Sequence, residues 1–143
     1  MTAEQSIQDR DFADADCFGC GPANGLGLRI KSFARADGTV VARWSPGAEH
    51  SNGAGAVCGG VLGTILDCHC AAAAAVALSA AAVTKEFAIE FLRPTPLEPL
   101  DHVARVVNRR RRSAEVEAVA SASGEACARF HGVFVVPRSG PAA

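Results

Sequence analysis

One uninterrupted apolar run constrains the fold of this 143-residue chain more than any other feature. Between residues 59 and 81 small and apolar side chains follow one another without a proline, and alanine, the best helix former, dominates. The run predicts one helix from about Gly59 to about Ala81. A helix that is apolar nearly all round is buried on most sides. Because the chain has no second convincing helix, we expect a sheet to wrap around this one.

The same run is the one segment that resembles a membrane span. It contains Asp67 and His69 near its middle, and alanine contributes less to membrane insertion than leucine or isoleucine does. We therefore expect a buried helix in a soluble protein, with no membrane partner. The N-terminal residues lack the basic and apolar regions of a secretory signal, which predicts a cytoplasmic protein whose six cysteines are free thiols.

The charge balance argues against a nucleic-acid partner. Lys plus Arg number 14 and Asp plus Glu number 15, for a net charge of -1, whereas nucleic-acid-binding domains are usually strongly basic. Aromatic residues make up only 6% of the chain and tyrosine is absent, so surfaces for stacking bases are scarce.

The segments on either side of the helix have the patterns of strands and turns. Alternation over residues 26–30 predicts a half-buried strand, and Asp37-Gly38 predicts a hairpin to a partner strand at residues 40–44. Further strands are expected at residues 87–92, 103–108, 114–122 and 126–136. Short connections favour antiparallel pairing. The expected fold class is α+β, with an antiparallel sheet of about five to six strands around one long central helix, which is the hotdog architecture.

The chain is expected to form a single domain with two loose ends. Residues 1–16 are polar and acidic and predict a solvated N-terminal arm. Residues 17–137 are expected to form the hotdog domain, and residues 138–143 a loose C-terminal tail.

Chemistry is most strongly indicated at the start of the helix and two turns further on. Gly59 and Gly60 open the helix, so their N–H groups are free to bind an anion or a developing oxyanion. Asp67 is the only acid in the apolar run, and an unpaired buried carboxylate costs several kcal/mol. This favours Asp67 as a base or nucleophile, although a structural aspartate that binds backbone N–H groups is the alternative.

The spacing of these groups has a consequence for assembly. Eight residues of helix rise about 12 Å, which is too far for Asp67 to reach a carbonyl held by Gly59 of its own helix. If both groups act on one substrate, they come from different subunits. We therefore expect a homodimer, assembled further into a dimer of dimers (a homotetramer).

Four stretches resemble the hotdog-fold acyl-CoA thioesterases of the phenylacetate-degradation (PaaI-like) type. They are CFGCGPANGLGLRI, DGTVVARWSP, CGGVLGTILD and TKEFAIEFLRPTPL, and the similarity extends over residues 17–136. In that family the helix begins His-Gly-Gly and an Asp follows nine residues after the His, the offset from Cys58 to Asp67 here. The resemblance implies hydrolysis of an acyl-CoA thioester by water or an anhydride at Asp67, with Gly59 and Gly60 polarising the carbonyl. No metal and no other cofactor is implied.

The resemblance also assigns roles to residues outside the helix. Asn52 and Thr84 match catalytic positions, the latter helping to place the water. His50 matches another frequent family position, where it either lines the substrate site or simply packs in the loop. Cys58 replaces the family His, either as a small filler that orients the loop or, less favoured, as a reactive thiolate at a helix N-terminus. His69 is expected to be a core or interface histidine.

A basic stretch and the cysteines allow further interpretations. Arg109, Arg110 and Arg111 could grip the phosphates of coenzyme A, or lie in a solvated hairpin. Cys17-x-x-Cys20 has the spacing of a metal-ligand pair. No second such pair completes a set, and Cys68 and Cys70 point about 200° apart on a helix, so we expect no metal and a Cys17 turn near the site or the subunit boundary.

Two other functions compete with hydrolysis. A non-catalytic acyl-CoA-binding hotdog protein is favoured by the presence of Cys58 in place of the family His. A hotdog enoyl-CoA hydratase is less favoured, because that chemistry usually uses an Asp-x4-His pattern and the residue five positions after Asp67 is Ala72.

Overall fold

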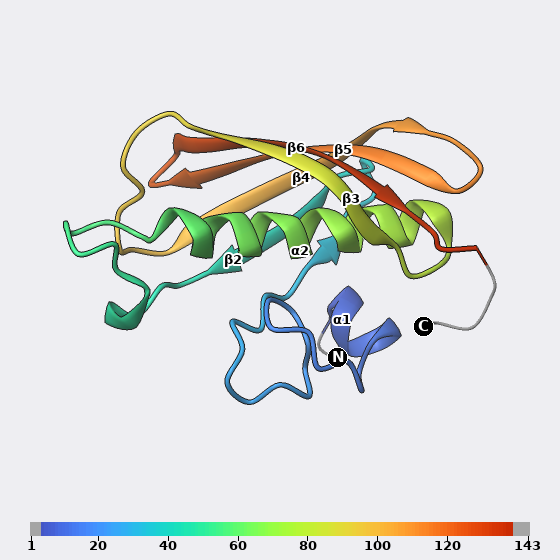
Figure 1. Ribbon diagram of the computed structural model, residues 1–143, viewed down its shortest axis with the longest axis horizontal. Coiled ribbons are helices and arrows are strands. Elements are labelled where there is room, and N and C mark those ends of the chain that lie inside the picture. The colour runs from blue at the N-terminus through green and yellow to red at the C-terminus, as the bar shows by residue number, and fades with distance from the viewer. Residues whose placement is uncertain (1–3, 139–143) are drawn as a thin grey trace.

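Six antiparallel strands form one sheet that curves around a single long helix in the computed structural model, which describes residues 4–138 (Figure 1). The elements are α1 (Ile7–Asp11), β1 (Phe33–Ala34), β2 (Val40–Trp44), the 3-10 turn η1 (Ala48–His50), α2 (Gly59–Leu78), β3 (Val83–Phe91), β4 (Leu100–Arg109), β5 (Ser113–Ala122) and β6 (Glu125–Val135). The strand order is β1-β2-β4-β5-β6-β3. The predicted hotdog architecture is thereby confirmed.

Helix α2 forms the centre of the core. Leu62, Ile65 and Leu66 are fully buried, and α2 packs mainly against β4 and β5, where buried and exposed residues alternate. The helix is long and apolar enough to cross a membrane, but 67% of its most apolar window is buried inside the protein, as in a core helix. It ends three residues before the predicted Ala81, because Ser79 adopts a left-handed conformation (φ 53°) that turns the chain off the helix axis.

The strand predicted at residues 26–30 is absent, which corrects the sequence interpretation. The Asn24 side chain accepts a hydrogen bond from the Leu26 N–H, and Arg29 has a positive φ of 52°, so this segment forms consecutive turns. The N–H groups of Leu28 and Ile30 donate to the carbonyls of residues 18 and 19 rather than to a strand. The partner of β2 is instead β1, a two-residue strand further along the chain.

The N-terminal segment is ordered against the helix and is not the expected solvated arm. Ile7 on α1 is buried with 1% exposure, and Gln8 beside it is equally buried. Figure 1 shows α1 and the loop that follows it on the side of α2 away from the sheet. Residues 1–3 of the expected arm and residues 139–143 of the expected tail lie outside the described residues.

A buried polar network joins this segment to α2. The Gln8 side chain both accepts from the Ser32 N–H (2.8 Å) and donates to the Ser32 hydroxyl (3.1 Å). The Ser32 hydroxyl lies 2.8 Å from Nδ1 of His69, whose Nε2 lies 3.0 Å from the Val40 carbonyl. Since a carbonyl only accepts, Nε2 bears the proton and Nδ1 accepts from Ser32. His69 is therefore the core histidine that the sequence predicts.

Candidate functional site

A groove between α2 and β3 contains the two groups that the sequence analysis singles out. Its volume is about 590 Å³. Five residues of α2 form one wall of the groove, and three apolar residues of β3 form the other. The lining residues are Gly59, Gly60, Gly63, Thr64, Asp67, Phe87, Ile89 and Phe91. The structure therefore brings the helix N-terminus and Asp67 to one groove, at its two ends.

The start of α2 provides unpaired donors to this groove. Cys58 is the N-cap residue and makes no side-chain capping bond. Among the described residues, no hydrogen-bond acceptor faces the N–H of Gly59 or of Gly60, whereas the Val61 N–H already bonds to the Cys58 carbonyl. A Cβ at Gly59 would lie 3.2 Å from the Phe91 ring, while the space beside Gly60 is open. The groove thus ends at N–H groups that can stabilise an oxyanion.

Asp67 is half-buried on the stripe of α2 that faces the groove. The Thr84 hydroxyl, at the start of β3, donates to its Oδ1 at 2.7 Å. Burial raises the pKa of the Asp67 carboxyl, and the Thr84 hydrogen bond partly opposes this rise in pKa. A carboxylate of raised pKa is a stronger base. Asp67 and Thr84, which the sequence names separately as candidates, are thus in contact within a single chain.

The loop before α2 is held by its own side chains. Asn52 Oδ1 accepts from the N–H groups of Ala54 (2.7 Å) and Ala56 (3.2 Å), so its oxygen shapes the loop. Asn52 also lines a second hollow of about 400 Å³ that adjoins the groove and shares Gly59 and Phe91 with it. Asn52 is therefore placed next to the groove, with its carbonyl oxygen already engaged.

His50 lies behind the loop rather than in the groove. Its Nδ1 accepts from the Gly47 N–H at 2.8 Å, and its ring packs on Trp44 with centroids 4.9 Å apart. Its carbonyl accepts from the Cys58 N–H at 2.8 Å and thereby fixes the start of α2. These contacts give His50 a structural role in the chain, and the substrate contact expected for it is not among them.

The basic stretch is remote from the glycines. Arg109 ends β4, and Arg110 and Arg111 continue into the turn before β5. Leu100, at the other end of β4, pairs with Trp44 beside the loop that leads to α2. Nine residues of strand span about 30 Å. The three arginines therefore lie at the far end of the sheet from Gly59 in the same chain, and the structure does not bring them to the groove.

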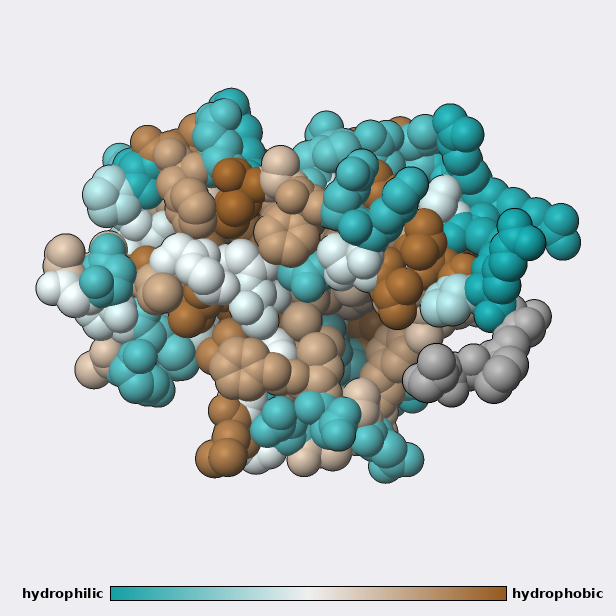
Figure 2. Space-filling model, viewed as in Figure 1, coloured by the Kyte–Doolittle hydropathy of each residue, from teal (hydrophilic) through white to brown (hydrophobic). Residues whose placement is uncertain are grey.

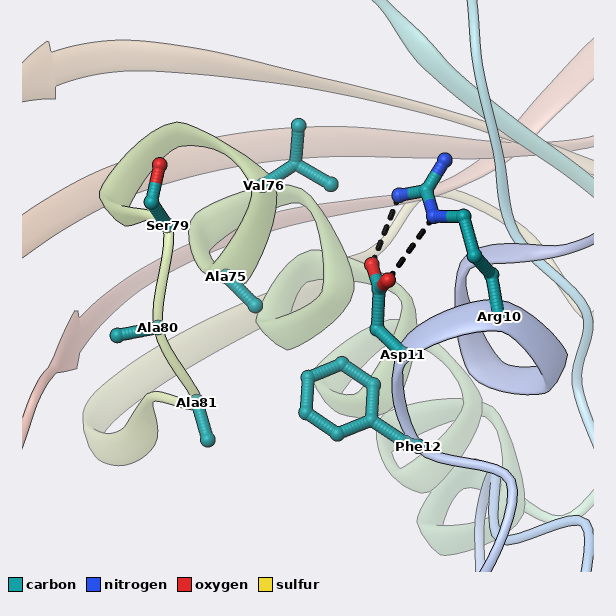
Figure 3. Close-up of a pocket in the computed structure, with 8 residues that line it drawn as sticks. All are labelled: Arg10, Asp11, Phe12, Ala75, Val76, Ser79, Ala80 and Ala81. Atoms are coloured by element: carbon teal, nitrogen blue, oxygen red, sulfur yellow. Dashed lines mark hydrogen bonds and ion pairs between the residues drawn. The ribbon is translucent and has the colours of Figure 1, made fainter.

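Another hollow, of about 410 Å³, lies at the C-terminal end of α2. Figure 3 shows Arg10 and Asp11 of α1 facing each other across two contacts, beside Ala75 and Val76 of α2. The Arg10 guanidinium donates to both carboxylate oxygens of Asp11, at 2.9 and 2.7 Å. Since the acid here is already paired and none of the predicted site residues lines it, we do not place the active site in this hollow.

The sequence analysis did not anticipate where the N-terminal cysteines lie. Cys17 and Cys20 converge on Cys68 of α2, and the Cys17 and Cys68 sulfurs are 3.6 Å apart. Hydrogen bonding with Cys68 lowers the pKa of the Cys20 thiol to about 7. The same hydrogen bond, together with burial, raises the pKa of the Cys68 thiol. The available signal was the Cys-x-x-Cys spacing, but the third thiol is brought in by tertiary packing alone.

Comparison with known proteins establishes the family. Residues 54–128, more than half of the chain, match the family model of the thioesterase superfamily, and the chain belongs to this superfamily. A thioesterase superfamily protein from Shewanella loihica is 31% identical, with 81% of this chain and 98% of that chain covered and a TM-score of 0.69. No curated protein matches the chain.

Two further solved structures share the fold. A thioesterase of Ralstonia eutropha described as phenylacetic acid degradation-related is 24% identical, with 92% of this chain and 100% of that chain covered and a TM-score of 0.74. A Streptococcus pneumoniae thioesterase solved with coenzyme A is 20% identical, with 75% and 87% covered and a TM-score of 0.67. The resemblance predicted from the sequence motifs is thereby confirmed.

Proposed function

We propose that the protein hydrolyses an acyl-CoA thioester to the free acid and coenzyme A. The observation that carries this proposal is that each chain presents, along one exposed groove, both halves of a hydrolytic site: the unpaired N–H groups of Gly59 and Gly60, and the half-buried Asp67. Membership of the thioesterase superfamily and the fold shared with a protein that holds coenzyme A support the substrate class. The chemistry needs no metal or other cofactor.

The proposed mechanism assigns one step to each group. Asp67 removes a proton from water as the water oxygen attacks the thioester carbonyl, and Thr84 orients the carboxylate. The N–H groups of Gly59 and Gly60 stabilise the oxyanion. Collapse of the tetrahedral intermediate breaks the carbon–sulfur bond and releases the coenzyme A thiol. In the nucleophilic variant, Asp67 attacks first and water then hydrolyses the mixed anhydride.

We further propose that this site is completed by a second subunit. The rise of about 12 Å along α2 between Gly59 and Asp67 separates the two groups by more than one thioester carbonyl can bridge. Edge strand β3 is exposed along its length, and its Phe87 and Phe91, which line the groove, are 44% and 49% exposed. Figure 2 shows apolar side chains across the middle of the face on which α2 and β3 lie. A long apolar edge strand is an aggregation hazard unless it is covered, and a second copy would cover it.

A dimer of dimers is proposed on a separate observation. Val103 and Val119 are paired across β4 and β5 on the outer face of the sheet and are 45% and 36% exposed. Light scattering tests both levels of assembly of this 14.7 kDa chain. We expect a tetramer, with Val103→Lys reducing it to a dimer that keeps its activity. A stable, active monomer would contradict the shared site.

Hydrolysis itself is tested with a panel of acyl-CoA thioesters that differ in acyl chain length and aromaticity. We expect release of free coenzyme A thiol from at least one of them, at a rate proportional to protein concentration. Repeated turnover in heavy-oxygen water then tests the nucleophilic mechanism, because heavy oxygen enters the Asp67 carboxyl only when water attacks the aspartyl carbonyl of a mixed anhydride. Absence of turnover across the panel would refute the proposal. A cytoplasmic location is part of the proposal, in keeping with six free thiols.

A non-catalytic acyl-CoA-binding role is the second candidate, favoured by Cys58 at the N-cap of α2. Tight binding of a thioester by calorimetry without thiol release would establish it. The variant Cys58→His restores the residue usual in the resembling family, and for an enzyme we expect equal or higher turnover. If Cys58→His and Cys58→Ala both abolish turnover, the thiol itself takes part in the chemistry.

A further inference from the structure

Three thiols from two distant parts of the sequence meet on the flank of α2 opposite the sheet. The sulfur atoms of Cys17, Cys20 and Cys68 all lie within 4.8 Å of one another. Cys68 is buried, Cys20 is partly buried and Cys17 is exposed. None of the three lines the thioester groove, so the proposed hydrolysis does not account for them.

The loop that presents the first two thiols is built for close approach. A Cβ at Gly19 would collide with the Cys68 sulfur, and one at Gly21 would collide with the backbone of Cys17 and Ala15. The Gly21 N–H donates to the Cys17 carbonyl at 2.8 Å, which closes a tight turn around both cysteines. The glycines of the Cys-Phe-Gly-Cys-Gly motif thus allow two sulfurs to lie against a third on the helix.

The other end of the loop is anchored by backbone hydrogen bonds. The N–H groups of Leu28 and Ile30 donate to the carbonyls of Phe18 and Gly19, at 2.8 and 3.0 Å. The Ala23 N–H donates to the Ala15 carbonyl at 3.0 Å. Because these bonds do not involve the thiols, the three sulfurs are held together before any ligand arrives.

We propose that Cys17, Cys20 and Cys68 bind one thiophilic d10 cation, Zn²⁺, through three thiolates, with a water molecule as the fourth ligand. Zinc–sulfur bonds of about 2.3 Å in a tetrahedron place sulfurs about 3.8 Å apart, and the Cys17 and Cys68 sulfurs are already 3.6 Å apart. Each thiol loses its proton to solvent on binding, with no change in oxidation state. The exposure of Cys17 leaves the fourth position open to water. The sequence expectation of no metal relied on the lack of a second Cys-x-x-Cys pair and on the divergence of Cys68 and Cys70, but Cys68 alone lies beside the first pair.

A cation at this point would clamp the N-terminal loop to α2. Cys17 and Cys20 belong to the loop and Cys68 to the core helix, so the metal would join two segments that otherwise pack side by side. Structural zinc sites contribute directly to folding stability. The proposed role of the cation is to stabilise the contact between loop and helix, and its binding is measurable without any assay of thioester hydrolysis.

The test uses the full chain, reduced and freed of metal, titrated with Co²⁺ as a spectroscopic substitute and then with Zn²⁺. We expect a thiolate-to-cobalt charge-transfer band that saturates at one Co²⁺ per chain and is displaced by Zn²⁺. Zn²⁺ also raises the unfolding temperature. The double variant Cys17→Ser/Cys20→Ser loses both effects, while Cys127→Ala, which removes a thiol buried elsewhere, keeps both.

If the double variant does not fold, alkylation of the unaltered chain tests the site instead. We expect Zn²⁺ to slow iodoacetamide labelling of Cys17 and Cys20 but not of Cys58, as measured by peptide mass spectrometry. A cobalt spectrum without thiolate bands, bands that persist in a folded double variant, or labelling of Cys17 and Cys20 unchanged by Zn²⁺ would each overturn the site. Failure of the fully reduced chain to bind Co²⁺ would also overturn it.

Discussion

Helix α2 has two polar residues only two positions apart, and its two flanks give them opposite roles. Asp67 lies on the flank toward β3, half-buried, with one hydrogen bond from Thr84 and an open groove beside it. His69 lies on the flank covered by the N-terminal segment, with both ring nitrogens bonded and no exposed surface. The same apolar helix thus contains one residue available for chemistry and one committed to packing. What covers each flank, and not the helix itself, decides the role.

Replacing Asp67 sharpens this comparison with the largest expected effect. Asp67→Asn keeps the shape of the side chain and the Thr84 contact but cannot act as a base, so thioester hydrolysis falls by about 100-fold or more. The free energy of unfolding is expected to change by less than about 1 kcal/mol, because the site is open on one side. Turnover and urea unfolding are measured on the same preparation. Asp101→Asn, on exposed β4, is the matched control, and near-wild-type turnover of Asp67→Asn would refute the mechanism.

Replacing His69 should have the opposite profile. His69→Leu removes the buried partner of the Val40 carbonyl and of the Ser32 hydroxyl, which still accepts from Gln8, and an unsatisfied buried group costs about 1–3 kcal/mol. We expect urea unfolding to show a loss of about 2–3 kcal/mol, with turnover of the folded fraction retained. Equal stability of His69→Leu and the unaltered chain would mean that the network does not hold the N-terminal segment in place.

The packed flank should also make the fold sensitive to acid. His102 on β4 is buried about 6.0 Å from the His69 ring, and neither of its nitrogens has a partner among the described residues. Burial, aided by the nearby His69, lowers its pKa to about 3. The unfolded chain, with an ordinary histidine pKa of about 6.5, then binds the proton more readily, so stability is complete above pH 6.5 and falls as the pH decreases.

From pH 7 to pH 5 this one group is expected to remove about 2 kcal/mol of stability. Denaturant unfolding across that interval measures the loss. In His102→Leu the pH-dependent loss should shrink, with stability at pH 7 unchanged or higher, because an unpartnered buried imidazole is replaced by an apolar side chain. An identical pH dependence in the variant would show that folding does not shift the pKa of His102.

The smallest effect is expected at Thr84, which supports Asp67 from β3. Thr84→Val keeps the shape of the side chain but removes the 2.7 Å hydrogen bond to the carboxylate, and a lost hydrogen bond to a charged group of about 1.4 kcal/mol corresponds to a tenfold lower turnover. Thr84→Ser retains the hydroxyl and should recover most of the rate. If serine is as poor as valine, the hydroxyl does not act through Asp67.

The sequence was sufficient for those parts of the fold that depend on local pattern. The unbroken alanine-rich run predicted α2 within three residues. Alternation predicted the strands, and β2, β4, β5 and β6 do bury alternate residues, whereas β3 is exposed along its length. The family resemblance pointed to Asp67 and Thr84 separately, but their contact with each other was not foreseen. The packing of α1 against the core was not predicted, because its buried polar side chains are satisfied by hydrogen bonds such as those between Gln8 and Ser32. Composition does not show such bonds.

The sequence pattern did not predict which distant segments lie close together. Residues 26–30 alternate like a strand, but Asn24 captures the Leu26 N–H and turns the chain instead. The arginines from 109 onward were correctly assigned to a strand connection, yet only the pairing of β4 shows that they lie at the far end of the sheet from Gly59. The meeting of Cys17 with Cys68 likewise depends on a fit of loop to helix that no periodicity encodes.

The strand order has a consequence for how the nascent chain folds. β3 follows α2 directly in sequence, but among the strands of residues 4–138 it pairs only with β6, which follows all the others in sequence. On the ribosome, the apolar helix and its edge strand therefore leave the exit tunnel before most of the sheet that buries them exists. Long-range pairing of this kind folds slowly and leaves apolar surface exposed meanwhile. Chains that stop before Glu125 would present that surface permanently, which makes them natural substrates for chaperones and proteases.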